Sequence, residues 1–207
     1  MSFYSRRIFP LLLDLTLGRK EIGVLREELL SGVKGRVLEI GIGSGLNLLH
    51  YPKGLQSLTA VDVNPGMRRK ALKRMKASGL DVDYRILSGE RLPFEDASFD
   101  SVVMTFTLCS LPDAEGTLKE MRRVLRAGGR LYFLEHGLSE EPRVARWQRR
   151  LNPIQKALGD GCHLDRDVLS LVKAAFHPLE CRKFYFENVP KTHGYFYQGV
   201  AEKVGHP

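Results

Sequence analysis

Cysteine is scarce in this 207-residue sequence, which has only Cys109, Cys162 and Cys181. Three thiols cannot all pair within one chain, and their spacing matches neither a disulfide framework nor a zinc-binding motif. This excludes a small secreted fold held together by disulfides. We expect reduced thiols in a cytoplasmic protein, and no metal site.

Long hydrophobic runs are also missing. The longest apolar stretch near the N-terminus, residues 8–17, is interrupted by Pro10 and Asp14, whereas about 18 or more consecutive apolar residues are needed to span a membrane. Arg6 and Arg7 precede this stretch, but no small-residue cleavage site follows it. The pattern therefore favours an amphipathic N-terminal helix over a signal peptide.

Hydrophobic and charged residues, in contrast, are present in ordinary amounts, at 43% and 27% of the sequence. This balance is typical of a globular protein and excludes a disordered chain. The length fits one domain. The net charge of +8 suggests nucleic acid or an anionic membrane surface as a partner.

Strand-like and helix-like patterns alternate along most of the sequence. Short runs of apolar and β-branched residues predict strands at 36–40, 58–61, 82–87, 99–104 and 130–134. Apolar residues at 3–4 spacing predict helices between them, at 67–75 and 118–125. Repeated βα units predict an α/β fold with a mostly parallel sheet and helices on both faces.

The C-terminal third has a different pattern. It predicts a basic helix at 141–159 that is broken at Pro153, a further helix at 165–176, and an antiparallel hairpin of two aromatic-rich strands at 181–186 and 194–202. We therefore expect a seven-stranded sheet in one domain, residues 1–207. Its segments are N-terminal helices (1–33), a ligand-binding core (34–136), a lid and helix (137–178) and C-terminal strands (179–207).

The strongest motif is a glycine-rich turn after the first expected strand. Glycines at 41, 43 and 45 let the backbone turn tightly and approach a ligand without a Cβ in the way. A dinucleotide fingerprint would need a glycine where Leu46 stands, and the Lys-Ser/Thr pair of a phosphate-binding P-loop is missing. Glu39 beside the turn repels a phosphate but suits a cationic ligand.

Asp62 ends the second expected strand, 17 positions after Gly45. Ligands of open α/β sheets bind at the carboxyl ends of the strands, where an acid accepts hydrogen bonds from ribose hydroxyls. A helix cap is the structural alternative, because Asn64 and Pro65 follow. The position after a glycine-rich first turn favours the ribose.

Residues 34–130 resemble the class I S-adenosylmethionine-dependent methyltransferases. The resemblance rests on the segment 39–45, Asp62, the segments 88–94 and 98–100, and the segment 120–129, all in family order. It implies a Rossmann-like, doubly wound fold that uses S-adenosyl-L-methionine and releases S-adenosyl-L-homocysteine. The residues implied to bind the cofactor are Glu39, Gly41, Ile42, Gly43, Gly45, Asp62, Val63, Met67, Gly89, Glu90 and Thr105.

One position departs from the family pattern. Many relatives carry an acid that holds the adenine amino group, and this sequence has Ser88 there. We therefore expect backbone groups and apolar stacking to hold the adenine.

The segments 107–110, 132–136 and 160–164 are also similar to the animal microsomal methyltransferase-like proteins and their soluble bacterial relatives. That animal group is associated with methylation of alkyl thiols, and its members begin with a hydrophobic anchor that is not expected here. The resemblance implies a small apolar acceptor, first a thiol or sulfide, and as the alternative a phospholipid or quinone.

Methyl transfer needs mainly positioning, because the sulfonium already carries an activated methyl group. A thiol acceptor, with a pKa of about 8.5, reacts as the thiolate. His136, at the end of the fifth expected strand, is the candidate base or thiolate stabiliser, with a capping or core hydrogen bond as the alternative. Cys162 is disfavoured as a covalent nucleophile, since none is needed. The substrate pocket is assigned to Tyr4, Cys109, Asp160 and His163.

Two basic segments have alternative interpretations. The charges of 68–76 indicate a solvated helix face. The segment 143–150 around Trp147 predicts a lid over the active site, and it leaves peripheral contact with an anionic membrane open. The N-terminal helix is expected to cover the cofactor.

Two other classes of function remain to be weighed. The charge suggests an RNA-modifying enzyme, but there is no appended RNA-binding module, and residues 105–108 do not form the Asn/Asp-Pro-Pro-aromatic motif of amino-group methylation. Nucleic acid is therefore not the expected partner. A non-catalytic binding module is opposed by the intact glycines and Asp62. The sequence indicates no oligomeric state.

Overall fold

A seven-stranded sheet with the order β3-β2-β1-β4-β5-β7-β6 runs through the computed structural model, which describes residues 2–177 and 179–204. The expected segment boundaries at 1, 178 and 207 lie outside these residues. The strands are β1 (Arg36–Ile40), β2 (Ser57–Asp62), β3 (Val82–Ile86), β4 (Phe99–Thr105), β5 (Leu125–His136), β6 (Leu179–Tyr185) and β7 (Tyr195–Glu202). Strands β1 to β5 pair in parallel, and β7 is antiparallel to both β5 and β6. The predicted sheet and C-terminal hairpin are confirmed.

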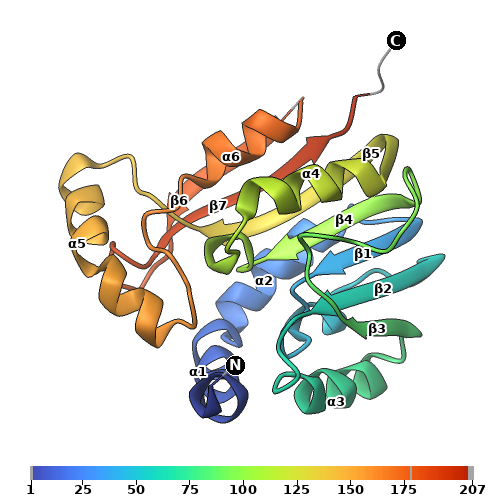
Figure 1. Ribbon diagram of the computed structural model, residues 1–207, viewed down its shortest axis with the longest axis horizontal. Coiled ribbons are helices and arrows are strands. Elements are labelled where there is room, and N and C mark those ends of the chain that lie inside the picture. The colour runs from blue at the N-terminus through green and yellow to red at the C-terminus, as the bar shows by residue number, and fades with distance from the viewer. Residues whose placement is uncertain (1, 178, 205–207) are drawn as a thin grey trace.

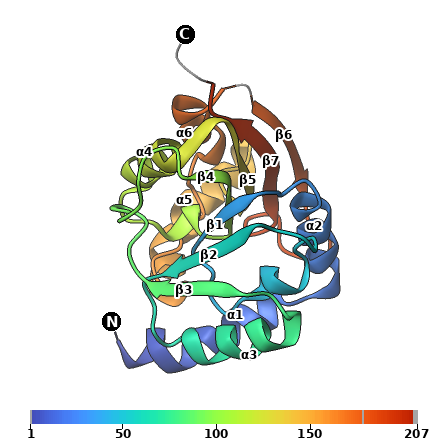
Figure 2. The ribbon, with the colours of Figure 1, turned by 90° about the vertical axis from the view of Figure 1, so that its right-hand side faces the viewer.

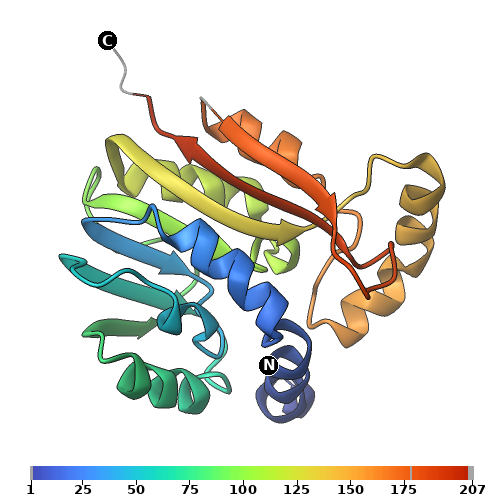
Figure 3. The same cartoon turned by 180° about the vertical axis from the view of Figure 1, so that it is seen from behind.

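Helices cover both faces of the sheet, as Figures 1, 2 and 3 show. Helices α4 (Ala114–Val124) and α6 (Val168–Ala175) pack on one face, and α2 (Lys20–Leu30) lies on the other. Helix α3 (Arg68–Ser78) lies beside the outer strand β3. In α4 the buried side chains Leu118, Met121 and Val124 have the predicted spacing. The central strands are buried on both sides, which fits their continuous apolar runs.

Strand β5 begins at Leu125, five residues before the predicted start. The pairing of β4 with β5 shifts register between Phe99 and Ser101, and Gly128 has a φ of 70°. The Ala-Gly-Gly segment is therefore an irregularity within the strand rather than a turn before it.

The glycine-rich turn leads into a short 3-10 helix, η2 (Leu46–Leu49), and not into a longer α-helix. Pro52 follows three residues later and disfavours helical backbone before it. The motif therefore keeps its turn but lacks the usual helix.

Helix α5 (Pro142–Leu158) continues through Pro153, so the predicted break there is wrong. A proline removes the hydrogen bond to the carbonyl four residues earlier. That carbonyl belongs to Arg149, which is exposed, so water can satisfy it. Figure 1 shows α5 beyond the carboxyl ends of the parallel strands, where a lid was predicted.

The N-terminal segment, η1 (Tyr4–Ile8) and α1 (Phe9–Leu17), lies at the same edge of the sheet (Figure 1). Asp14 of α1 accepts hydrogen bonds from Lys70 and Arg74 of α3 and from the hydroxyl of Ser44 in the glycine-rich turn. The basic face of α3 is thus partly a docking surface, and only its other charges are solvated. Among the described residues, no helix is both long enough and apolar enough to cross a bilayer.

Candidate functional site

The glycine-rich turn is shaped by three left-handed residues, since Gly41, Gly43 and Gly45 have φ of 73°, 54° and 83°. A Cβ at Gly41 would lie 2.2 Å from the Thr107 hydroxyl, and one at Gly45 would lie 2.9 Å from Leu48. A Cβ at Gly43 would meet only a backbone oxygen at 4.0 Å among the described residues. The turn is therefore packed behind Gly41 and Gly45 and open at Gly43, where a ligand can approach the backbone.

Asp62 is tied to this turn. One carboxylate oxygen accepts a hydrogen bond from the Gly43 N–H at 2.7 Å, and the other accepts one from the Asn64 N–H at 2.7 Å. Burial raises the pKa of Asp62 above its ordinary value, although both amides oppose the shift. A carboxylate has about four acceptor positions, so two remain for ligand hydroxyls. The capping role and the ribose role are thus compatible.

Four further residues that are predicted to bind the cofactor follow the ends of β2 and β3. Val63 is exposed and Met67 is buried, while the Leu87 N–H donates to the Asp62 carbonyl. Gly89 is packed so tightly that a Cβ would lie 3.0 Å from Ile40. Glu90 is exposed, and its carboxylate accepts a hydrogen bond from the backbone N–H of Asp113, the residue before α4. These residues all lie after the carboxyl ends of β2 and β3, and their contacts with a cofactor remain predictions.

Glu39 belongs to a buried polar network rather than to the open side of the turn. Its two carboxylate oxygens accept hydrogen bonds from Asn47 at 2.8 Å and from the Tyr51 hydroxyl at 2.9 Å. Arg26 of α2, only 3% exposed, donates to Asn47 and to Thr105. Burial raises the pKa of Glu39 to about 7 and lowers that of Arg26 to about 10. The network joins α2, the first turn and the end of β4.

Sequence reasoning missed Arg26, Asn47 and Tyr51. A signal was present for Arg26, because it shares a helix face with the buried Ile22, Leu29 and Leu30. The hydroxyl of Thr105, expected to touch the ligand, accepts bonds from Arg26 and Asn47. Direct contact of Glu39 or Thr105 with the cofactor stays a prediction.

Thr107 and Glu135 connect the turn to the neighbouring strand end. The Thr107 hydroxyl donates a hydrogen bond to the Gly41 carbonyl oxygen at 3.4 Å. Glu135, fully buried, accepts hydrogen bonds from the N–H groups of Thr107 and Leu108 at 2.6 and 2.8 Å. Burial raises the pKa of Glu135 to about 7. This carboxyl, which was not predicted, fixes the backbone between β4 and the short helix η3 (Leu108–Ser110).

Cys109, His136 and Cys162 form a compact group, the Cys-His-Cys cluster. Cys109 lies in η3, His136 ends β5, and Cys162 lies in the loop after α5. His136 Nε2 is 3.0 Å from Cys162 Sγ, and the three donor atoms all lie within 4.8 Å of one another. Both cysteines are buried and His136 is partly exposed. The cluster combines a predicted catalytic residue, a predicted pocket residue and a cysteine that had been set aside.

The cluster changes the acidity of its members. The Cys109 thiol and then the His136 ring hold the pKa of Cys162 well below that of a free thiol, against the effect of burial. The neighbouring Cys162 and burial raise the pKa of Cys109. Burial lowers the pKa of His136, but Cys162 and Glu135 outweigh it, so this pKa lies above its ordinary value. The lowered pKa of Cys162 and the raised pKa of His136 favour a thiolate at Cys162 beside a charged imidazole.

The remaining predicted pocket residues surround the loop that carries Cys162. The Tyr4 hydroxyl donates to the Leu158 carbonyl, and the Ser5 hydroxyl donates to Asp160 at 2.6 Å. The His163 N–H donates to the Cys109 carbonyl at 2.9 Å, and its ring lies 3.7 Å from Asp165. The N-terminal segment, the loop and η3 thus meet at one edge of the sheet.

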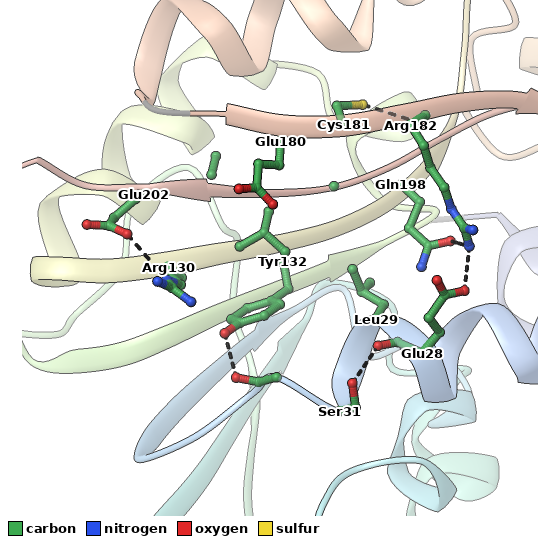
Figure 4. Close-up of a pocket in the computed structure, with 14 residues that line it drawn as sticks. Glu28, Leu29, Ser31, Arg130, Tyr132, Glu180, Cys181, Arg182, Gln198 and Glu202 are labelled. Carbon is green, nitrogen blue, oxygen red and sulfur yellow. Dashed lines mark hydrogen bonds and ion pairs between the residues drawn. The ribbon is translucent and has the colours of Figure 1, made fainter.

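A groove of about 520 Å³ lies away from this edge, between the end of α2 and strands β5, β6 and β7. Figure 4 shows it lined by Tyr132, Glu180, Arg182 and Gln198, with Glu28 of α2 opposite. It contains none of the predicted site residues. The candidate site is therefore the carboxyl edge of the sheet, from Asp62 to the Cys-His-Cys cluster.

Comparisons with known proteins show the family of this chain. Residues 38–133 match the family model described as a methyltransferase domain. The thiol S-methyltransferase TMT1B from Rattus norvegicus is 35% identical over 190 residues, which cover 83% of this chain and 76% of the relative. Its Homo sapiens counterpart is 39% identical over 162 residues, covering 74% and 66%. A phosphatidylethanolamine N-methyltransferase from Cereibacter sphaeroides is 32% identical over 127 residues, covering 60% and 62%.

Solved structures share the fold. The N-methyltransferase NodS from Bradyrhizobium japonicum superposes with a TM-score of 0.67 at 16% identity, covering 93% of this chain and all of that one (100%). A phosphoethanolamine N-methyltransferase from Haemonchus contortus, solved with S-adenosylhomocysteine, gives a TM-score of 0.66 at 15% identity, covering 95% and 61%.

Proposed function

Because this chain belongs to the class I S-adenosylmethionine-dependent methyltransferases, we propose that its methyl acceptor is a small thiol or hydrogen sulfide. The observation that carries the proposal is the similarity to thiol S-methyltransferases over 83% of the chain. The similarity extends beyond the cofactor-binding core, since that core ends near residue 136. Of the proposed acceptor-side residues, His136 lies at this boundary and Cys162 beyond it, whereas Cys109 lies within the core.

The residues at the carboxyl edge fit S-adenosylmethionine. Gly43 leaves its side of the turn open, so the amino acid part of the cofactor can approach the backbone. Asp62 retains acceptor positions for the two ribose hydroxyls. The exposed side chain of Val63, next to Asp62, offers an apolar surface for the adenine. The bound cofactor supplies a methyl group on a positively charged sulfur.

The protein then has to position the acceptor sulfur and exclude water. In-line displacement requires about 3–3.5 Å between the acceptor atom and the methyl carbon. Thr107 and Glu135 fix the backbone between the cofactor turn and the Cys-His-Cys cluster, so both binding sites are held by one rigid connection. The N-terminal segment and the loop after α5 cover the edge from outside.

The test is methyl transfer measured by mass spectrometry with purified protein and S-adenosylmethionine carrying a labelled methyl group. The acceptors are 2-mercaptoethanol, sodium sulfide, phosphatidylethanolamine vesicles and a short-chain quinol. We expect labelled thioether or methanethiol from the first two and no labelled lipid or quinol ether. Methylation of the lipid or quinol without any labelled sulfur product would overturn the proposal. Asp62→Asn, which weakens cofactor binding, is the negative control.

We further propose that the enzyme is cytoplasmic and contacts anionic membranes peripherally. Apolar side chains are exposed on α1 and α5, with exposed fractions of 75% at Leu15, 60% at Ile154 and 54% at Trp147. Arginines at 143, 146, 149 and 150 accompany them on α5. Sedimentation with phosphatidylserine vesicles should deplete the protein from solution. Equal sedimentation with neutral vesicles would contradict a contribution of the arginine charges to membrane binding.

A further inference from the structure

The Cys-His-Cys cluster has the composition of a metal site with one open position. Its donors are two cysteine sulfurs and one imidazole nitrogen, which are typical ligands of zinc. Two cysteines and one histidine leave the fourth position of a tetrahedral zinc ion for a water or a substrate, as in catalytic zinc sites.

The distances suit a metal of this size. Zinc binds sulfur at about 2.3 Å and imidazole nitrogen at about 2.0–2.1 Å, so that two tetrahedral thiolate ligands lie about 3.8 Å apart. In this protein the three donor atoms lie within 4.8 Å of one another, with 3.0 Å between His136 Nε2 and Cys162 Sγ. Shifts of less than about an ångström would bring all three into coordination distance.

The surroundings hold the three donors in place. Glu135 binds the N–H groups at the start of η3 and so fixes the backbone that carries Cys109. Gln155 donates to Cys162 Sγ at 3.4 Å. His136 is held in β5 by its pairing with Phe196 of β7. Such outer contacts orient metal ligands in known sites.

The surroundings of the two sulfurs leave room for a metal cation among their charges. In the described part of the chain, the hydrogen-bond partners of the two sulfurs are Ser110, His136 and Gln155, and none is lysine or arginine. Both cysteines coordinate zinc as thiolates, and a divalent ion neutralises the two negative charges that this coordination places in a buried site. His136 is the partly exposed member of the cluster, whereas both cysteines are buried.

We propose that Cys109, His136 and Cys162 bind a zinc ion whose fourth position takes the thiol that becomes methylated. This inference rests on the proposed function. The acceptor thiol binds as the thiolate and releases its proton to solvent. Its sulfur forms a bond to the methyl carbon, and the electron pair of the broken sulfur–carbon bond stays on the cofactor sulfur. The neutral thioether is a weaker ligand than the thiolate and leaves.

The first experiment measures metal content and does not depend on activity. Purified full-length protein is loaded with zinc, dialysed and analysed by elemental mass spectrometry, and a cobalt-loaded sample is examined by absorption spectroscopy. We expect about one ion per chain and sulfur-to-cobalt charge-transfer absorption. Cys162→Ser and His136→Gln should weaken zinc binding by more than about 100-fold, because even outer-shell changes cost 10–100-fold. Cys181→Ser, outside the cluster, is the matched control and should bind like the wild type.

A second measurement confirms that each variant is folded. Calorimetry should give the same S-adenosylmethionine affinity for Cys162→Ser as for the wild type. Absence of stoichiometric metal, or equal metal binding by all variants, would overturn the inference. Formation of a Cys109–Cys162 disulfide in place of metal binding, seen as one titratable thiol instead of three, would also overturn it.

The acceptor role is tested with the thiol assay after removal of zinc by a chelator. We expect at least a 10-fold loss of thiol methylation that returns on adding zinc. Full activity of the metal-free protein would overturn the inference while leaving the proposed function intact. Metal binding without methylation of any thiol would instead refute the proposed function and the acceptor role together.

Discussion

Replacement of Arg26 by methionine tests the buried network beneath the cofactor turn. Methionine fills much of the same volume but removes the guanidinium that donates to Asn47 and Thr105. Each lost hydrogen bond to a buried acceptor costs about 1–3 kcal/mol. The ionised Glu39 carboxylate also loses its nearby cation, and removing one member of a buried charge pair typically costs about 3–5 kcal/mol.

The pH dependence separates these two costs. Because the pKa of Glu39 in the native protein is raised to about 7, the native state binds more protons than the unfolded chain between pH 4.5 and 7. The contribution of Glu39 to stability is therefore complete below pH 4.5 and is lost as the pH rises through 7. Without Arg26 this pKa rises further, and the loss extends above pH 7.

We expect Arg26→Met to lower the free energy of unfolding by about 1–3 kcal/mol at pH 6, where Glu39 is largely protonated, and by about 3–5 kcal/mol at pH 8. The assay is urea unfolding of the cofactor-free protein at both pH values, with Lys20→Met on the exposed face of α2 as the control. Combining Arg26→Met with Glu39→Gln should abolish the difference between the two pH values. Equal losses at pH 6 and pH 8 in the single variant would refute the reasoning.

Three further changes test the carboxyl edge. Gly43→Ala should weaken S-adenosylmethionine binding by at least about 10-fold in calorimetry. The control is Gly79→Ala, which is equally left-handed but in open space and should cost only about 1–2 kcal/mol of stability. Equal cofactor affinity in the two variants would contradict the approach of the cofactor to the backbone at Gly43. Asp62→Asn should weaken cofactor binding by about 100-fold through loss of charge-assisted hydrogen bonds, and an unchanged affinity would exclude the ribose role. Asp14→Asn should speed tryptic cleavage after Arg19, since the carboxylate holds α1 on α3. Because the pKa of Asp14 is lowered, its carboxylate stabilises the native state above pH 3.8. The free energy of unfolding of Asp14→Asn should therefore approach that of the wild type as the pH falls below that value.

The sequence revealed those parts of the molecule that depend on neighbouring residues. The glycine-rich turn and Asp62 follow their strands directly, so their spacing alone indicates a ligand at the strand ends. The alternation of strand-like and helix-like runs also predicts the parallel sheet, because each run is made of residues that are close in sequence. Pro153 misled the reasoning, because a proline can remain within a helix when the carbonyl it deprives is solvated.

Sequence reasoning named Cys109 and His136 as site residues but missed their contact with Cys162, and such missed contacts are long-range. Cys109, His136 and Cys162 are separated by 27 and 26 residues, and they meet only because β4, β5 and the loop after α5 end at the same edge. Arg26 is buried because α2 packs onto the sheet, where its side chain reaches Asn47 and Thr105. No spacing rule connects Asp14 with a helix more than 50 residues later.

Ser5 forms hydrogen bonds to both parts of the site, the turn beside Asp62 and the loop that carries Cys162. Its carbonyl oxygen accepts a hydrogen bond from Asn64 beside Asp62, and its hydroxyl donates to Asp160 near Cys162. Release of either end loosens the other, because both bonds belong to one buried residue. We therefore expect spent cofactor and methylated product to leave in one opening event, so that the rate of this opening, and not methyl transfer, sets the turnover when acceptor is abundant.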